Sequence, residues 1–179
     1  NKGVALAKGA VVGTLNADDF YAHARVLERV QRTFEETGAN ATYGDLVFVD
    51  GDNPDQVCRR WRSGKSAVLS FYWGWMPPHP TFFLDRTWYE RFGHYRLDLS
   101  TAADYELMLR MIVKHRVPIV YISETMVKMR VGGVSTRNMK NRLRANYMDR
   151  EAWVINELKP YPWTRVMKPL RKVSQFLYK

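Results

Sequence analysis

The sequence lacks most of the signals that mark extracellular, fibrous or membrane-spanning proteins. Its only cysteine, Cys58, excludes an internal disulfide and a zinc site built from several cysteines. No stretch approaches the roughly 18 consecutive apolar residues of a membrane span, and the first residues do not show the charged-then-apolar pattern of a secretory signal. Eleven glycines and eight prolines among 179 residues are too few for a collagen-like or low-complexity chain. We therefore expect a cytoplasmic, globular protein.

Charge is distributed unevenly along the chain. Residues 1–127 contain 15 Lys and Arg against 15 Asp and Glu, whereas residues 128–179 contain 13 basic and 3 acidic residues, which accounts for the formal net charge of +10. Residues 1–127 are thus neutral, and residues 128–179 form a basic tail. This distribution predicts that the basic tail faces something anionic, such as nucleic acid, an anionic membrane surface or a phosphorylated substrate. A solvated basic face without a partner is the alternative.

Segments of helical and strand periodicity alternate along most of the chain. Helices are expected at 2–8, 24–37, 85–92, 101–115, 136–158 and 164–178, and strands at 10–15, 43–50, 118–123 and 126–131. The aromatic segment 70–83 is too rich in proline for a helix, and we expect it to be irregular with extended pieces. The alternation favours an α/β layered fold over a helix bundle or an all-β barrel.

An acidic pair follows the first expected strand. The tetrapeptide Asn-Ala-Asp-Asp at 16–19 comes directly after the apolar run 10–15. Ligands of open α/β sheets bind beyond the carboxyl ends of strands, and a hard divalent cation takes one or two carboxylates while water and phosphate oxygens complete its shell. The pair thus fits a site in which Mg²⁺ or Mn²⁺ bridges the protein to a diphosphate. A turn that caps the following helix is the alternative, because Asn and Asp favour both positions.

A second carboxylate, Asp104, lies at the start of the helix expected at 101–115. Its spacing from Thr101 resembles a capping box, with Asp in place of Glu or Gln, which would make it a structural residue. The other interpretation is a general base that takes a proton from an attacking hydroxyl. The positive end of the helix favours the ionised form that a base needs. Spacing alone leaves both interpretations open.

Six segments have a characteristic order along essentially the whole chain. They are NKGVALAKG, VVGTLNADDFY, YGDLVFVD, GWMPPHPTFF, RFGHYRLDLSTAADYELMLR and VKMRVGGVST. Together they resemble the family 2 glycosyltransferases, above all the bacterial group that works in surface polysaccharide assembly. The resemblance implies a GT-A fold, which is α/β and Rossmann-like with a mixed sheet flanked by helices. It also implies a nucleotide-diphosphate sugar as donor, Mn²⁺ or Mg²⁺ as cofactor, and a single displacement that inverts the anomeric carbon.

The resemblance also assigns roles to the acidic residues. Asp18 matches the residue that holds the metal against the donor diphosphate, with Asn16 and Asp19 beside the donor. Many members have an Asp where this sequence has Asn16, and the amide lowers the negative charge of the site. The family's catalytic carboxylate falls on Asp104, which implies the general base rather than the helix cap.

Further donor and acceptor contacts follow from the same resemblance. The segment 129–136 resembles the flexible loop that folds over the donor diphosphate, although the His often found there is absent. Hydrogen bonds to phosphate are expected from Arg130, Ser135 and Arg137. Acceptor contacts are expected at His79 and Trp75, because both lie in the aromatic segment and a tryptophan can stack on a sugar ring. Packing in the core is the alternative for both side chains.

The start of the family's domain has no counterpart in this sequence. Members begin with a strand–helix section that contacts the base and ribose, and this sequence starts after it. We therefore expect an N-terminally truncated chain from a longer protein. Residues 1–135 are expected to form a partial GT-A catalytic domain, and residues 136–179 a basic helical extension.

The extension combines apolar repeats with basic residues. In the last helix Met167, Leu170 and Val173 repeat every three residues, opposite several lysines and arginines, a pattern that suits an interfacial helix on anionic lipid. It also fits a glycan or lipid-linked acceptor and a peripheral position on the inner face of the cytoplasmic membrane. Helices that only pack on the catalytic domain are the alternative.

Two other functions compete with glycosyl transfer. A basic nucleic-acid-binding module would interleave basic and stacking residues on one surface, whereas the aromatic residues cluster at 71–92 and the basic ones at 128–179. No nucleic-acid partner is therefore expected. A catalytically silent relative or scaffold is the other alternative, because of Asn16 and the missing front section.

Overall fold

A mixed β-sheet forms the centre of the protein. The computed structural model describes residues 1–65, 68–131 and 139–177. Across the sheet the order is β1 (Val11–Gly13), β5 (Phe83–Asp85), β3 (Ala41–Val49), β6 (Ile119–Arg130) and β2 (Phe20–Tyr21), and β4 (Val57–Trp61) pairs with β3 off this path. The pairing of β3 with β6 is parallel and the other pairings are antiparallel. The sequence analysis did not predict β2, β4 or β5 as strands.

Strand β6 is a single strand of 12 residues, so the expectation of two strands around a turn at 123–125 is wrong. The register explains why: Tyr43 lies opposite Tyr121, but Asp45 lies opposite Thr125, so β6 bulges beside Gly44. Met126 fills the space there, since a Cβ on Gly44 would lie 2.3 Å from the Met126 sulfur. The polar residues that resembled a turn are accommodated as a bulge within a continuous strand.

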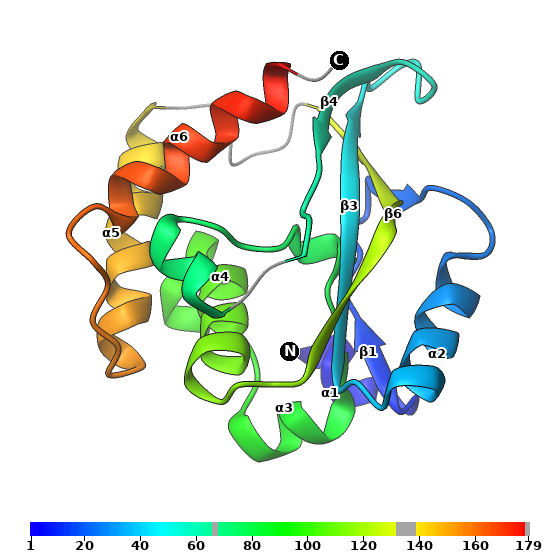
Figure 1. Cartoon of the computed structure of the whole chain (residues 1–179), viewed down its shortest axis with the longest axis horizontal. Helices are drawn as coiled ribbons and strands as arrows, with labels where there is room; N and C mark the ends of the chain where they lie inside the picture. The colour runs from blue at the N-terminus through cyan, green and yellow to red at the C-terminus, as the bar shows by residue number, and fades with distance from the viewer. Residues whose placement is uncertain (66–67, 132–138, 178–179) are drawn as a thin grey trace.

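Most of the expected helices are present, with somewhat different ends. They are α1 (Lys2–Leu6), α2 (Val26–Thr37), α3 (Arg86–Phe92), α5 (Met139–Ile155) and α6 (Thr164–Leu177). Gly38 ends α2 in the left-handed conformation at φ 65°, and the Asp85 carboxylate caps α3 by accepting a 2.8 Å hydrogen bond from the Thr87 amide. Figure 1 shows α2 on one side of the sheet and α5 and α6 on the other.

The helix expected at 101–115 has three conformations in succession. The 3-10 helix η3 (Leu97–Ala102) leads into α4 (Ala103–Met108), which continues as the π-helix η4 (Leu109–Lys114). The aromatic segment contains no α-helix, as expected, but it forms two 3-10 helices, η1 (Val68–Trp73) and η2 (His79–Thr81), ahead of β5.

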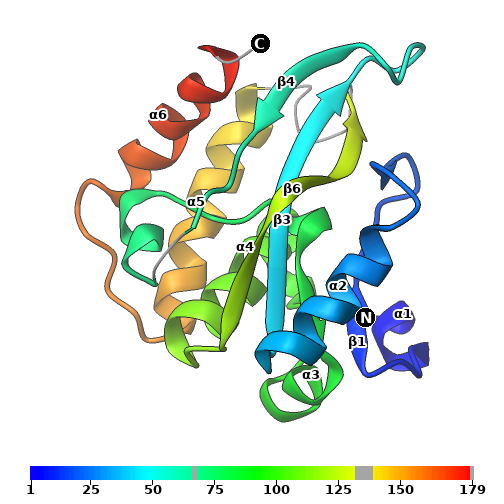
Figure 2. The same ribbon diagram turned by 45° about the vertical axis from the view of Figure 1, so that its right-hand side comes forward.

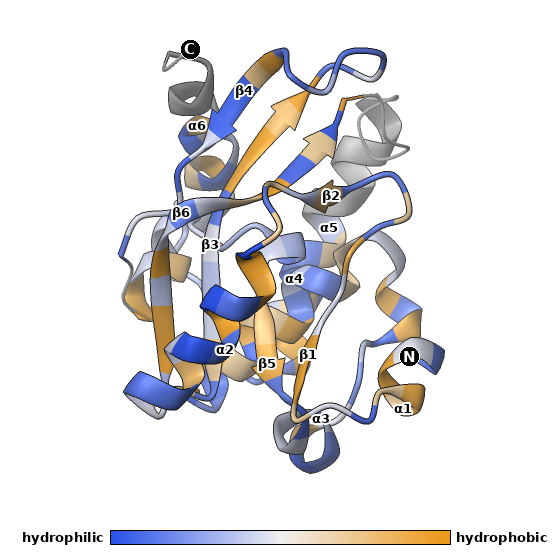
Figure 3. Cartoon of the chain, turned by 90° about the vertical axis from the view of Figure 1, so that its right-hand side faces the viewer, coloured by the Kyte–Doolittle hydropathy of each residue, from blue (hydrophilic) through white to orange (hydrophobic). Residues whose placement is uncertain are grey.

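Two apolar cores lie on the two faces of the sheet. Val26 and Val30 of α2 pack with Leu46 on one face, and Figure 3 shows the hydrophilic outer side of α2 beside the hydrophobic β1 and β5. The larger core, on the other face, joins β3 and α4 to Trp153 of α5. The domain boundary at 135 stays a prediction; α5 nevertheless shares a core with the rest of the chain. Over the described ranges, none of the helices has the length and apolar character needed to cross a membrane.

Candidate active site

Three side chains from separate segments meet at the end of β1. The Nε2 atom of His79 lies 2.9 Å from the hydroxyl of Tyr95 and 3.0 Å from that of Thr14, and the two hydroxyls are 3.3 Å apart. The antiparallel pairing of β1 with β5, which places Val11 opposite Asp85, brings the residues after β1 close to η2. The result is a compact cluster of one imidazole and two hydroxyls.

Asp104 adds a carboxylate to this cluster. It lies in the first turn of α4, where its Oδ1 accepts a 2.8 Å hydrogen bond from the Tyr105 amide. The capping box suggested by the sequence does not form, because Ala102 occupies the N-cap position and the Thr101 hydroxyl instead lies 3.9 Å from a methionine sulfur. The negative charge of Asp104 acts on both His79 and Tyr95, so the three groups are electrostatically linked.

Burial sets the protonation of the cluster. Loss of solvent lowers the pKa of His79, and the neighbouring Asp104 carboxylate opposes this change only in part. Burial likewise raises the pKa of Tyr95, with the charge of Asp104 as a further cause. At neutral pH the imidazole and the phenol are therefore both uncharged.

The acidic tetrapeptide forms its own turn two residues after Thr14. The Asn16 amide donates a 2.8 Å hydrogen bond to Asp19 Oδ2, and the Asp19 amide donates a 3.1 Å bond to the Asn16 carbonyl. Asp19 is only 7% exposed, whereas Asp18 is exposed. Because the pairing of β2 with β6 places Phe20 opposite Lys128, this turn lies next to the end of β6 at Arg130.

The turn places a buried and an exposed carboxylate next to each other. Burial raises the pKa of Asp19, while the bond from Asn16 and the main chain of Arg130 lower it in part. The Oδ1 atom of Asp19 is buried and has no hydrogen-bond partner among the residues that the structure describes. Within the same residues no group of three His, Cys, Asp or Glu could enclose a metal. A magnesium or manganese ion that takes most of its ligands from phosphate and water fits these carboxylates.

The other predicted contact residues have different surroundings. Trp75 is 6% exposed, and its indole nitrogen donates a 3.0 Å hydrogen bond to the Ser63 carbonyl, so it packs in the core. Arg130 is exposed and lies over the Phe20 ring, 5.7 Å from its centroid. The predictions for Ser135 and Arg137 fall outside the described residues.

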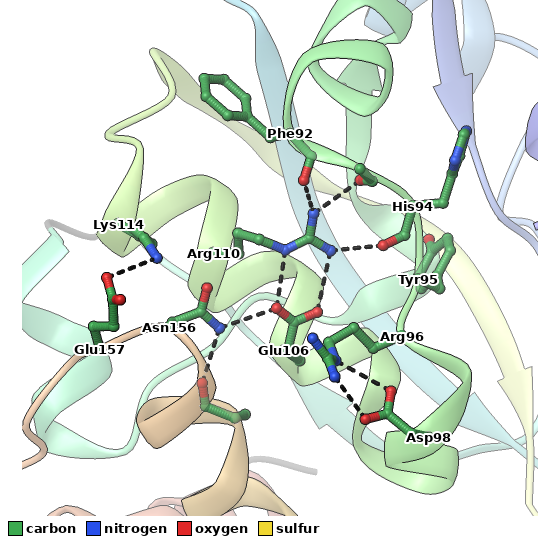
Figure 4. A network of polar contacts seen from close by, with 12 residues as sticks. Phe92, His94, Tyr95, Arg96, Asp98, Glu106, Arg110, Lys114, Asn156 and Glu157 are labelled. Carbon is green, nitrogen blue, oxygen red and sulfur yellow. Dashed lines mark hydrogen bonds and ion pairs between the residues drawn. The ribbon is translucent and has the colours of Figure 1, made fainter.

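A buried polar network holds the turn that carries Tyr95 (Figure 4). Arg110 donates hydrogen bonds to the carbonyl of Phe92, to that of Gly93 at 2.9 Å and to that of His94 at 2.7 Å. On the other side of the same turn, the Asn1 side chain pairs with the Tyr95 main chain through bonds of 2.9 and 3.0 Å. The hydrogen bonds from Arg110 and from Asn1 together hold this turn in the position where the Tyr95 hydroxyl contacts His79.

The sequence analysis singled out Asp104 and His79, whose roles stay predictions, but it did not find Thr14 and Tyr95. Thr14 and Tyr95 are 65 and 16 residues from His79 in the chain, and no periodicity links them. One sequence signal pointed toward the surroundings of Tyr95. Glu106 and Arg110 have the four-residue spacing that is typical of an ion pair on a helix, and Arg110 holds the turn that carries Tyr95.

Comparison with known proteins gives a match at the level of structure. No family model matches the sequence, and no curated protein shows significant similarity to it. The fold matches the S. aureus glycosyltransferase TarS, residues 1–349, in complex with UDP, with a TM-score of 0.60 and 13% identity over 99% of this chain and 48% of that one. A second TarS structure of the same residues gives a TM-score of 0.61 and 13% identity, covering 97% of this chain and 50% of that one. The chain thus shares the fold of these TarS structures and spans about half of their length.

Proposed function

We propose that this chain is part of an inverting glycosyltransferase of the GT-A type, which moves a sugar from a nucleotide-diphosphate sugar to an acceptor hydroxyl. The observation that carries the proposal is the likeness to TarS, a protein whose structure contains UDP, over 99% of this chain. A fold supports many chemistries, so the residues at the end of β1 must supply the reaction.

The acidic turn binds the donor diphosphate in this proposal. Asp18, exposed beside the buried Asp19, would hold Mn²⁺ or Mg²⁺, which offsets the negative charge of the departing nucleoside diphosphate. Asn16 orients Asp19 through their 2.8 Å hydrogen bond, and Arg130 supplies a positive charge at the same edge. We also assign donor contacts to Ser135 and Arg137.

Asp104 is the general base. The acceptor oxygen forms a bond to the anomeric carbon while the bond from that carbon to the diphosphate oxygen breaks on the opposite face, and the hydroxyl proton passes to the Asp104 carboxylate. The neutral His79 and the Tyr95 hydroxyl beside it can orient the acceptor hydroxyl by hydrogen bonds without competing for its proton. We assign the acceptor to the glycan or lipid-linked class, with the enzyme on the inner face of the cytoplasmic membrane.

Calorimetric titration of UDP and GDP, with and without Mn²⁺, tests the donor site. We expect binding of one nucleotide that depends on Mn²⁺, and its loss in Asp18→Ala. Asp52→Ala is the matched control, because Asp52 lies exposed in the turn after β3. Unchanged metal-dependent binding in Asp18→Ala would overturn the assignment of the donor site.

A further inference from the structure

Three aromatic rings form an exposed cluster where η1 meets the start of α6. Trp73, Tyr161 and Trp163 are 49%, 40% and 41% exposed. The Trp73 and Trp163 ring centroids lie 5.6 Å apart, and those of Tyr161 and Trp163 lie 5.0 Å apart. Large aromatic side chains contribute most when they are buried, so three that share one half-exposed surface indicate a contact site.

One face of α6 extends this cluster. Val166 and Leu170 follow Trp163 at spacings of three and four residues, and they are 56% and 53% exposed. They therefore form an apolar stripe along the side of the helix that faces away from the protein. We call Trp73, Tyr161, Trp163, Val166 and Leu170 the aromatic–aliphatic surface.

The opposite face of α6 is fixed to the protein, so the exposure of the stripe is a stable feature. Thr164 is 4% exposed and its hydroxyl donates a 2.6 Å hydrogen bond to the Tyr72 carbonyl. Lys168 forms a 2.5 Å ion pair with Asp149 of α5, and its ammonium lies 3.7 Å from the centre of the Tyr105 ring. Figure 2 shows α6 lying along α5 in this arrangement.

Exposed basic residues lie in the segments next to the aromatic–aliphatic surface. Strand β4 packs against α6, and the exposed Arg62 and Lys65 follow that strand directly. Lys159 is exposed just before Tyr161. Asp149 pairs with Lys168, and Glu157 lies 3.5 Å from Lys114, so a lysine matches each of these two acidic residues and the other basic residues are in excess. The surroundings are therefore positively charged.

We infer that the aromatic–aliphatic surface binds an anionic lipid bilayer, with Trp73 and Trp163 at the level of the headgroups. Trp and Tyr favour that level of a bilayer, and an apolar stripe with a basic border is the pattern of helices that lie in the interface. A second copy of the chain would bring two basic borders together, and Val166 and Leu170 offer nothing to stacked bases. The inference deepens the membrane part of the proposed function and does not depend on catalysis.

Flotation of the full chain with vesicles tests this inference. We expect the protein to float with vesicles of phosphatidylcholine and phosphatidylglycerol, to stay behind with phosphatidylcholine alone, and to dissociate as the ionic strength rises. The double variant Trp73→Ala/Trp163→Ala should bind at least about tenfold more weakly. Leu27→Ala is the matched control, because Leu27 is 53% exposed on α2 at the other side of the sheet.

Quenching of tryptophan fluorescence by brominated lipid locates the contact. The double variant Trp73→Phe/Trp163→Phe retains aromatic bulk, so it should fold and float, but the quenching seen in the unsubstituted chain should disappear. Failure to float with anionic vesicles, equal flotation of the alanine variant, or persistent quenching in the phenylalanine variant would each overturn the inference. Because the assay uses no nucleotide, loss of UDP binding and loss of vesicle binding are separate results.

Discussion

Arg110 and Glu106 form a buried ion pair one turn apart along the α4–η4 helix. The Arg110 Nε atom lies 2.9 Å and its Nη2 atom 3.1 Å from the two carboxylate oxygens of Glu106, a bidentate arrangement. The Glu106 side chain is 1% exposed, and Asn156, directly after α5, donates a further 3.0 Å hydrogen bond to it. The pair thus connects the helix that begins beside Asp104 to α5 and to the turn that holds Tyr95.

Arg110→Ala should destabilise the protein strongly. The substitution leaves the Glu106 carboxylate buried without its counter-charge and frees three carbonyl groups, so we expect a loss of about 3–5 kcal/mol in the free energy of unfolding. Urea denaturation measures it. Arg96→Ala is the control, because the Arg96–Asp98 pair is solvent-exposed and should contribute less than about 1 kcal/mol. Equal losses in the two variants would contradict the structural role of Arg110.

Asp104→Asn should lower the rate of sugar transfer by about 10²–10⁴-fold, because an amide cannot take up the acceptor proton. Nucleotide binding should be retained, since the proposed donor site is built from other residues. Initial rates with a nucleotide-sugar donor measure the effect, and Asp98→Asn, on the exposed surface nearby, is the control. A chain that binds nucleotide but shows no transfer activity before substitution would instead be a catalytically silent relative.

The stability of the protein should fall as the pH drops below about 6.5, the ordinary value for histidine. Burial lowers the pKa of His79 in the folded state. In this range the unfolded chain therefore takes up a proton that the folded protein binds only at lower pH, and protonation favours unfolding. The contribution of His79 is fully present above that pH.

The comparison of His79→Gln with the unsubstituted chain isolates this effect. Urea denaturation between pH 8 and about 5 should show a shallower loss of stability in the variant, because glutamine does not titrate. His94→Gln controls for an exposed histidine. Parallel curves for the His79→Gln variant and the unsubstituted chain would show that His79 titrates as if exposed.

Gly74→Ala should detach α6 from η1. Gly74 has φ 74°, and a Cβ there would lie 2.3 Å from the main-chain nitrogen of Lys168. Gly38→Ala is the matched control, since φ is 65° at that position and nothing lies within 4 Å of the added Cβ. The control should lose about 1–2 kcal/mol of stability from its backbone conformation alone. Gly74→Ala should lose clearly more, because its Cβ would also clash with the main chain of α6. Similar losses, measured by urea denaturation, would mean that the helix moves aside without cost.

The fold was largely predictable from local patterns, and its exceptions have local causes. The helix over 26–37 has one apolar face and a glycine stop, which made it predictable. Strand β4, with two arginines in five residues, has no alternation and forms through its pairing with β3. The bulge in β6 depends on Gly44 in another strand, so the sequence around 123–125 contained no sign of it.

The candidate site was predictable only where a single residue carries the chemistry. Asp104 and Asp18 belong to short motifs, so the resemblance could assign roles to them, and these roles stay predictions. Thr14 and Tyr95 join the site because β1 pairs with β5 and because Arg110 holds a turn, and both are consequences of tertiary structure. Trp75 was expected to contact the acceptor because it lies in the aromatic segment, but its side chain packs in the core.

The parallel pairing of β3 with β6 has a consequence for how the site is assembled during folding. His79, Tyr95 and Asp104 all lie in the crossover between Val49 and Ile119 that joins these two strands. A crossover of this length must close before the strands can pair, and loop closure of this kind slows folding. Asp104, His79 and Tyr95 therefore meet in the same slow step that completes the sheet, so the recovery of this cluster on refolding should follow sheet formation rather than the fast formation of individual helices.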